Sequence, residues 1–167
     1  MKYQEAKEKF IQTWGTLGSN WGINRTMAQV HALLLISPNA MSADEIMAEL
    51  QISRGNANIN IRSLIDWGLV KKELKAGERK EFFRAEKDMW KTALQIMRER
   101  RKRELAPLKE VLKEIGNVEG QDQPEKTAEF QKMVQRVDEF SSSADKILDK
   151  MSRADENWFF KIFMKLM

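Results

Sequence analysis

The chain has 167 residues, of which 42% are hydrophobic, and its 29 basic and 25 acidic side chains give a formal net charge of +4. It has no cysteine and one histidine, His31, which excludes disulfides, thiolate zinc sites and thiol redox sensing and leaves no adequate ligand set for a metal. No apolar run approaches the ~20 residues of a membrane-spanning helix and no signal-peptide pattern opens the chain, so we expect a cytoplasmic protein that needs no cofactor.

The amino-terminal segment predicts an amphipathic helix over residues 4–18. Its apolar positions recur at helical spacing, and they are Phe10, Trp14 and Leu17. Residues 18–25 hold two glycines and two asparagines, so we expect a loop there, with Trp21 packed onto the core.

Two more helices are expected before residue 53. The first spans about 26–36, with Thr26 as its N-cap and a buried side formed by Val30, Leu33 and Leu34. His31 lies among these apolar residues and is interpreted as a half-buried histidine, not as a ligand or pH switch. The other, which is the third helix of the chain, begins at Ser42, because Ser42 and Glu45 have the spacing of a capping box.

The segment SRGNANINIRSLIDW, residues 53–67, predicts a fourth helix with an unusual outward face. Ser53 is its expected N-cap, Gly68 ends it, and its buried side is Ala57, Ile61 and Leu64. The predicted DNA-contacting residues of this segment are Ser53, Arg54, Gly55, Asn56, Asn58, Ile59 and Arg62. Asparagine and arginine offer the donors that base edges and phosphates accept, isoleucine suits a thymine methyl group, and glycine permits close approach to a phosphate.

Two strands should follow at residues 69–75 and 80–86, joined by a turn at 76–79. This hairpin is basic, and the residues expected to contact phosphate or the minor groove are Lys71, Lys72, Lys75, Arg79 and Lys80. Helices followed by a basic hairpin are the element order of a winged helix-turn-helix domain. The predicted fold class is therefore mainly α with a small β-hairpin, a winged helix-turn-helix domain followed by carboxy-terminal dimerisation helices.

The segments SRGNANINIRSLIDWGLV and AGERKEFFRAEKDMW closely resemble the GbsR branch of the MarR-type winged helix-turn-helix transcriptional regulators. The resemblance covers roughly residues 26–104. It implies a dimeric, DNA-binding repressor or activator whose effector is a small osmolyte-related molecule. Because a helix-turn-helix dimer binds two half-sites about one DNA turn apart, we expect a homodimer that binds double-stranded DNA at a palindromic operator.

Beyond residue 87 the pattern returns to helix, with Pro107 expected to break or kink it. The run RERRKR at 98–103 has two interpretations, contact with the DNA backbone or the solvated face of a linking helix. Residues 116–126 are predicted to be a linker, and a long helix with an apolar repeat near 3.5 residues follows over about 130–151. Within it, the three serines at 141–143 indicate either a small-residue patch or a break.

We therefore predict two domains, a DNA-binding domain over residues 1–90 and a helical dimerisation and effector region over 91–167. The seams at 105–115 and 130–151 need partners, which favours a homodimer held by these helices. The short aromatic segment at 157–167 is interpreted as a helix docked on its own protein, with contact to a membrane surface as the alternative.

Tryptophan is frequent for so short a chain, with five residues. Large core residues are the simple explanation. The alternative is an aromatic-lined effector pocket made of Trp14, Trp21, Trp67 and Trp90, which would suit a choline-like ammonium group. The overall prediction is a regulator rather than an enzyme, because the sequence has no cysteine, no usable histidine constellation, no phosphate-cradling glycine loop and no paired carboxylate in a plausible pocket. The alternative is a winged-helix subunit for protein interaction or a scaffold.

Overall fold

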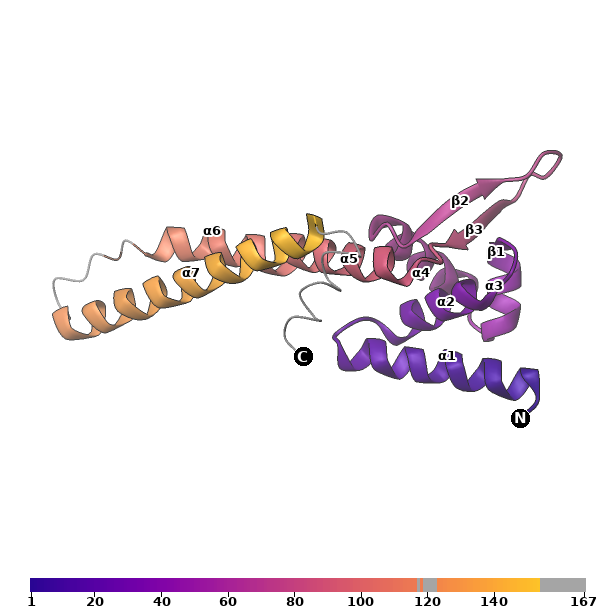
Figure 1. Ribbon diagram of the computed structural model, residues 1–167, viewed down its shortest axis with the longest axis horizontal. Helices are drawn as coiled ribbons and strands as arrows, with labels where there is room; N and C mark the ends of the chain where they lie inside the picture. The colour runs from indigo at the N-terminus through magenta and orange to yellow at the C-terminus, as the bar shows by residue number, and fades with distance from the viewer. Residues whose placement is uncertain (117, 119–122, 154–167) are drawn as a thin grey trace, which may run out of the picture. The chain divides into compact units, whose positions relative to one another are not determined.

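The computed structural model describes residues 1–116, 118 and 123–153 (Figure 1). The chain forms two compact units, Met1–Thr92 and Ala93–Met167. In the described part of the chain, no helix combines the length and the apolar character that crossing a bilayer demands. The predicted segment at 157–167 lies outside the described residues.

The first unit begins with two packed helices, α1 (Tyr3–Asn20) and α2 (Arg25–Ile36). The loop predicted from residue 18 starts later, because Gly18 is a buried helical residue of α1. A Cβ atom at Gly18 would lie 2.5 Å from the Ala28 Cβ, so the glycine allows α1 to approach α2 closely.

The buried side of α1 differs from the predicted stripe. Ile11, Gly15 and Gly18 are buried, whereas Phe10 and Leu17 are more than one-third exposed. Trp21 is 54% exposed, so the expectation that it packs onto the core is wrong. Two of the three buried residues are glycines, which a periodic pattern of large apolar side chains does not reveal.

Helix α2 forms the centre of the first unit. Its N-cap is Asn24 and not Thr26, since the Asn24 side chain accepts a hydrogen bond of 3.1 Å from the Met27 backbone N–H. The predicted core residues Val30, Leu33 and Leu34 are fully buried. His31 is buried with them, more deeply than predicted, and burial lowers its pKa to about 4.

Helices α3 (Ala43–Leu50) and α4 (Arg54–Asp66) form the helix-turn-helix pair. The predicted capping box is confirmed: the Ser42 backbone N–H donates to the Glu45 carboxylate at 2.6 Å, and the Glu45 N–H donates to the Ser42 hydroxyl at 3.3 Å. The hydrogen bond from the Ser42 backbone lowers the pKa of Glu45. Gln51, with φ of 52°, makes the turn into the next helix.

The sheet has three strands where only a hairpin was predicted. β2 (Val70–Leu74) pairs with β3 (Glu81–Ala85), and β1 (Met41–Ser42) adds to the other edge of β3, giving the order β1-β3-β2. Both pairings are antiparallel within this described sheet. A two-residue strand is too short to show alternating hydrophobicity, which explains why the sequence did not reveal it.

Lys87 ties the end of the hairpin to α2. Its ammonium group donates hydrogen bonds to the backbone carbonyls of Leu34, Leu35 and Ser37 at 2.8, 2.5 and 2.7 Å. A cation at this position satisfies the carbonyls that the last turn of a helix leaves without partners, and it also interacts favourably with the helix dipole.

Helix α5 (Met89–Arg100) leads into the second unit, where the π-helical turn η1 (Arg101–Leu105) connects it to α6 (Ala106–Ile115). Pro107 was expected to break or kink the helix, but it occupies the first turn of α6 directly after the π turn, and the chain remains helical. Helix α7 (Pro124–Arg153) lies beside α6 (Figure 1). It continues through residues 141–143 without a break, and Ser141 is buried.

Candidate nucleic-acid interface

The outward face of α4 carries the predicted contact residues together. Its exposed members are Arg54, Gly55, Asn56, Asn58, Ile59 and Arg62, while Ala57, Ile61 and Leu64 on the opposite side are buried as predicted. Ile59 is 67% exposed, which is unusual for a large apolar residue in the middle of a helix. This face therefore presents forked polar groups around one exposed apolar side chain.

Gly55 has no internal reason to be glycine. Apart from its chain neighbours and the adjacent helix backbone, no described atom lies within 4 Å of the position that a Cβ would occupy there. Glycine within a helix destabilises it by roughly 0.5–1 kcal/mol relative to alanine. Its presence at the start of α4 favours close approach by something outside the chain.

Asn60 is a buried polar residue of α4 that the sequence did not single out. It is only 4% exposed, and its amide donates to the Asn56 backbone carbonyl at 2.8 Å and to the Asn56 side-chain oxygen at 2.7 Å. The buried amide thus fixes the orientation of the exposed one. An asparagine on the inner side of the helix, four residues after another, was the available signal.

Ser53 and Arg54 have structural partners as well as exposed surfaces. The Ser53 hydroxyl accepts a hydrogen bond of 3.3 Å from the Asn56 backbone N–H, which confirms it as the N-cap. Arg54 pairs with Asp44 of α3 at 3.0 Å, and Lys80 of the hairpin approaches the same carboxylate at 3.4 Å. Asp44 therefore holds two of the predicted contact residues near each other at the protein surface.

The five hairpin cations do not form one continuous face. Lys71 and Lys72 are consecutive in β2 and so lie on opposite sides of the sheet. Lys72 pairs with Glu81 at 2.7 Å, and the Lys75 ammonium lies 3.7 Å from the centre of the Phe82 ring. Among the described residues, Lys71 and Arg79 have no ion-pair partner and are exposed, so these two are the best placed for an external anion.

The four tryptophans of the predicted pocket lie on several elements of the first unit. Trp14 of α1 stacks on Phe10 at 5.6 Å and lies 6.3 Å from the His31 ring, measured between ring centroids. Trp21 follows the end of α1, Trp67 follows α4, and Trp90 belongs to α5. Trp14, Trp67 and Trp90 are half-buried.

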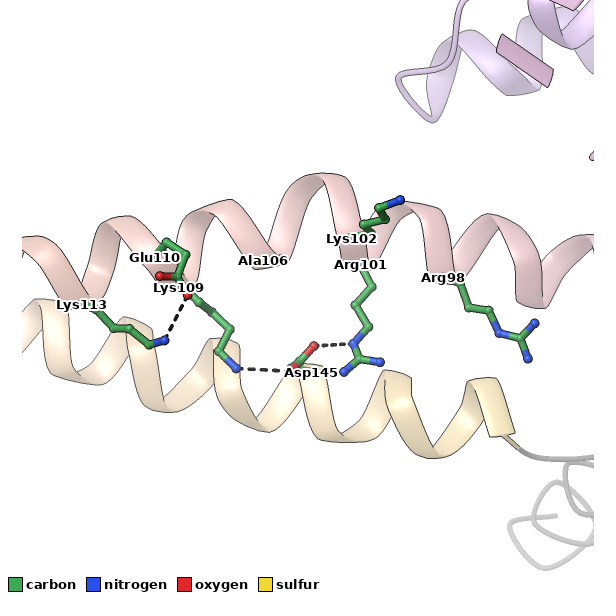
Figure 2. Close-up of a pocket in the computed structure, with 8 residues that line it drawn as sticks. All are labelled: Arg98, Arg101, Lys102, Ala106, Lys109, Glu110, Lys113 and Asp145. Atoms are coloured by element: carbon green, nitrogen blue, oxygen red, sulfur yellow. Dashed lines mark hydrogen bonds and ion pairs between the residues drawn. The ribbon is translucent and has the colours of Figure 1, made fainter. Parts of the chain in front are cut away.

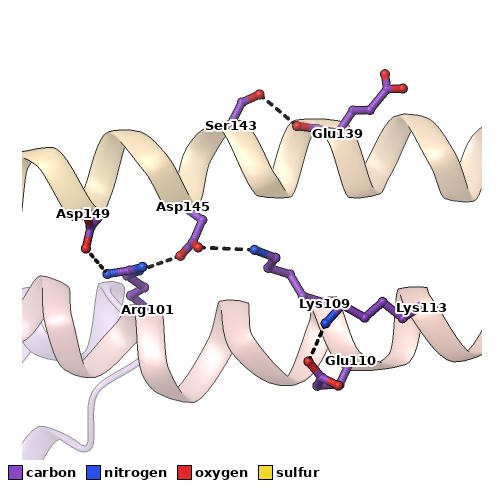
Figure 3. Close-up of polar contacts among 8 residues, drawn as sticks. All are labelled: Arg101, Lys109, Glu110, Lys113, Glu139, Ser143, Asp145 and Asp149. Atoms are coloured by element: carbon purple, nitrogen blue, oxygen red, sulfur yellow. Dashed lines mark hydrogen bonds and ion pairs between the residues drawn. The ribbon is translucent and has the colours of Figure 1, made fainter.

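Part of the basic run at 98–103 has a role that neither interpretation foresaw. Arg101 pairs with Asp145 and Asp149 of α7, at 2.5 and 2.8 Å (Figure 3). Arg103 pairs with Glu99 at 3.1 Å. These partners lie within the second unit. The run therefore contributes to the contact between η1 and α7.

Residues 21–81, which include the helix-turn-helix pair and most of the hairpin, match the MarR family. Residues 21–81 form a MarR-family domain. Their fold is a winged helix-turn-helix, as the sequence predicted.

Two proteins resemble the chain that contains this MarR-family domain. The HTH-type transcriptional repressor GbsR of Bacillus subtilis (strain 168) is 30% identical over 88 residues, 53% of this chain and 48% of the repressor. A solved structure described as the crystal structure of a transcriptional regulator is similar with a TM-score of 0.66 over 89% of this chain and 97% of that one, at 18% identity. The match to a GbsR protein confirms the resemblance that the α4 and hairpin segments indicated.

Proposed function

We propose that this protein is a transcriptional regulator that binds double-stranded DNA as a homodimer, with α4 in the major groove. The exposed face of α4 is the main observation that supports this proposal. Arg62, Asn58 and Ile59 offer bidentate donors and a methyl contact, and Gly55 leaves open the space that a phosphate backbone would occupy. The matched relative also supports it, since its name describes a transcriptional repressor.

In this proposal the hairpin contacts the phosphate backbone or the minor groove. Lys71 and Arg79 are the residues we assign to phosphate contacts, because they are exposed and have no ion-pair partner among the described residues. Lys72, Lys75 and Lys80 make contacts within the domain, and DNA would have to compete for them. The hairpin contacts position the domain, and α4 supplies the sequence preference.

The salt dependence of DNA binding tests the hairpin assignment. Each phosphate contact contributes a slope of about −0.9 to the logarithm of affinity against the logarithm of salt concentration. We expect Lys71→Ala and Arg79→Ala each to reduce the slope by about one on a mixed-sequence duplex. Lys91→Ala removes an exposed cation from α5 and should leave the slope unchanged. If all three variants behave alike, the hairpin does not contact DNA.

Dimerisation is proposed through α7. Its residues Phe130, Met133, Val137, Phe140, Ala144, Ile147 and Met151 recur at alternating spacings of three and four. This seam is the repeat of a coiled coil, and its members Phe140 and Ile147 are 76% and 59% exposed in the isolated chain. Val134 and Ser141, on a different face of α7, are already buried, so the seam is available for a second copy.

A dimer is also what the DNA-binding proposal requires. One helix-turn-helix unit contacts few base pairs, whereas a two-fold symmetric pair reads two half-sites about 34–36 Å apart. A palindromic operator is therefore part of the proposal.

The four tryptophans remain our proposed effector site, for a small ligand with a quaternary ammonium group. Their support is chemical: aromatic faces attract such cations, and Trp21 is accessible to solvent. Titration of tryptophan fluorescence with choline and betaine tests the idea. A saturable change supports it, and a flat response at millimolar ligand would contradict it.

A further inference from the structure

Asp44, in the first turn of α3, forms ion pairs with cations of both elements that we propose contact DNA. Its Oδ1 atom lies 3.0 Å from the Arg54 Nη2 atom at the start of α4. Its Oδ2 atom lies 3.4 Å from the Nζ atom of Lys80, the residue before β3. The guanidinium of Arg54 and the ammonium of Lys80 therefore converge on a single carboxylate.

The Asp44 carboxylate lies where Arg54 and Lys80 would hold an oxygen anion from outside the chain. Guanidinium and ammonium groups bind carboxylate and phosphate oxygens through the same charge-assisted hydrogen bonds. Both cations can therefore exchange Asp44 for phosphate oxygens without a change in the kind of contact. It follows that Asp44 and the DNA phosphates compete for the same donors.

The ion pairs of Asp44 are exposed, which distinguishes them from a carboxylate that joins helices. Asp145 in the second unit also lies between two cations, Arg101 and Lys109 (Figure 2). There the three side chains are between 21% and 32% exposed, and the pairs join η1 and α6 to α7. Asp44 and its two partners are between 49% and 72% exposed. Because exposed ion pairs contribute little to stability, those of Asp44 can break without loss of the fold.

The neighbouring Glu45 has a structural role that excludes it from such an exchange. Its carboxylate accepts hydrogen bonds from the Ser42 backbone N–H at 2.6 Å and from the Ser42 hydroxyl at 2.8 Å. These hydrogen bonds lower the pKa of Glu45, and the charges of Lys75 and Lys80 lower it further. Of the two adjacent carboxylates, Glu45 caps α3 and Asp44 pairs with the cations of α4 and the hairpin.

We propose that Asp44 is an internal competitor of the DNA phosphates, which weakens backbone binding and makes stable binding depend on the base contacts of α4. This inference rests on the proposed function. Phosphate contacts supply essentially all of the non-specific affinity of a DNA-binding protein, whereas a specific complex adds base contacts. Asp44 must be displaced from Arg54 and Lys80 before they bind phosphate, so it lowers the phosphate contribution. Stable binding then needs the base contacts of Asn58 and Arg62.

Binding of a mixed-sequence duplex at several salt concentrations tests the proposal. We expect Asp44→Asn to bind about tenfold more tightly than the wild type at low salt, because each of two exposed pairs is worth up to about a fivefold factor. The slope of log affinity against log salt concentration should become steeper by about one to two, since Arg54 and Lys80 become available to phosphates.

Asp66→Asn is the matched control. It makes the same change of charge at an exposed residue at the other end of α4, and so measures the general effect of removing one negative charge. We expect its affinity to stay within about twofold of the wild type at moderate salt, where distant charges are screened, and its slope to be unchanged. A gain of equal size in Asp44→Asn and Asp66→Asn would overturn the proposal.

A protein that carries both Arg54→Ala and Lys80→Ala shows whether Asp44 acts through these cations. In that protein Asp44→Asn should have no larger effect than Asp66→Asn. A purely structural role of Asp44 at the start of α3 predicts the opposite sign, because loss of fold weakens binding and lowers the melting temperature. Weaker binding by Asp44→Asn, or an equal gain with and without the two cations, would therefore contradict the competitor role.

The same measurements separate this inference from the proposed function. If the wild type binds no duplex even at low salt, the DNA-binding proposal is wrong and the role of Asp44 is refuted with it. If the wild type binds and Arg62→Ala weakens its binding to a selected site, while Asp44→Asn and Asp66→Asn bind alike, only the role of Asp44 is refuted.

Discussion

At the scale of single residues, two buried polar side chains of the first unit have surroundings that lead to testable predictions. Asn60 connects to the exposed amide of Asn56, and His31 lies in the apolar centre of α2 beside Trp14. Within the described residues the His31 Nε2 atom has no hydrogen-bond partner. The sequence indicated that His31 is not a ligand, but only packing of α1 against α2 determines how deeply it is buried.

His31 should make the protein acid-sensitive. Its pKa falls from 6.5 in the unfolded chain to about 4 on burial, so the unfolded chain binds more protons between these values and stability decreases as the pH falls through this range. From pH 7 to pH 5 the loss is about 2 kcal/mol. Urea unfolding at the two pH values measures it. His31→Leu should not show this part of the decrease in the free energy of unfolding. An equal decrease in wild type and variant would show that His31 is not its cause.

Asn60→Ala should weaken specific DNA binding although Asn60 does not reach the surface. Its loss leaves the Asn56 amide without its fixed orientation, and we expect a cost of about 1 kcal/mol in binding and a similar cost in stability. Fluorescence anisotropy with an operator duplex gives the first value. Ser63→Ala, which removes a hydroxyl that donates a hydrogen bond to the Ile59 carbonyl, is the matched control. Unchanged affinity in Asn60→Ala would show that Asn56 is not a contact residue.

At the scale of elements, the sequence predicted features that depend on neighbouring residues, but it did not predict contacts between segments far apart in the chain. The Ser42 capping box, the Ser53 cap and the turn at Gly68 depend on neighbours within a few residues, and each was predicted. The β1 strand pairs with Phe82 and Phe83, about 40 positions away, and left no local pattern. The ion pairs of Arg101 with α7 also join distant segments, which is why the basic run kept two interpretations.

Lys87→Met should destabilise the first unit by about 1–2 kcal/mol. It removes three hydrogen bonds from an ammonium group to the carbonyls at the end of α2 and leaves those carbonyls to water. Thermal or urea unfolding measures the change, and Lys91→Met on α5 is the control because its pairing with Asp88 is exposed. Equal stability of the two variants would indicate that Lys87 does not cap α2.

At the scale of the whole molecule, the proposal requires two copies of the chain. The sequence predicts one apolar repeat near 3.5 residues over about 130–151, whereas the structure has two faces there, a buried one with Val134 and Ser141 and the seam with Phe140 and Ile147. The sequence period near 3.5 indicated a packing helix, but it did not assign Phe140 and Ser141 to different neighbours. That assignment required the contacts of α7 with α6 and η1.

Phe140→Glu should therefore convert the dimer to a monomer without unfolding the chain. Phe140 is 76% exposed in one copy, so the change has little effect on the isolated fold but places a charge in the seam. Small-angle scattering at micromolar concentration measures the mass. Gln135→Glu adds the same charge to an exposed position of α7 outside the seam and should remain dimeric. A monomeric wild type, or a dimeric Phe140→Glu protein, would rule out the seam as the interface.

The central claim, that α4 of a symmetric dimer reads DNA sequence, is tested most directly by selecting bound duplexes from a random pool. The wild type should enrich palindromic sites whose half-sites are centred about one helical turn apart. Arg62→Ala should bind the enriched site more weakly by about 1–3 kcal/mol and lose preference at one position in each half-site. Recovery of no common sequence, or an identical site and affinity with Arg62→Ala, would contradict the account.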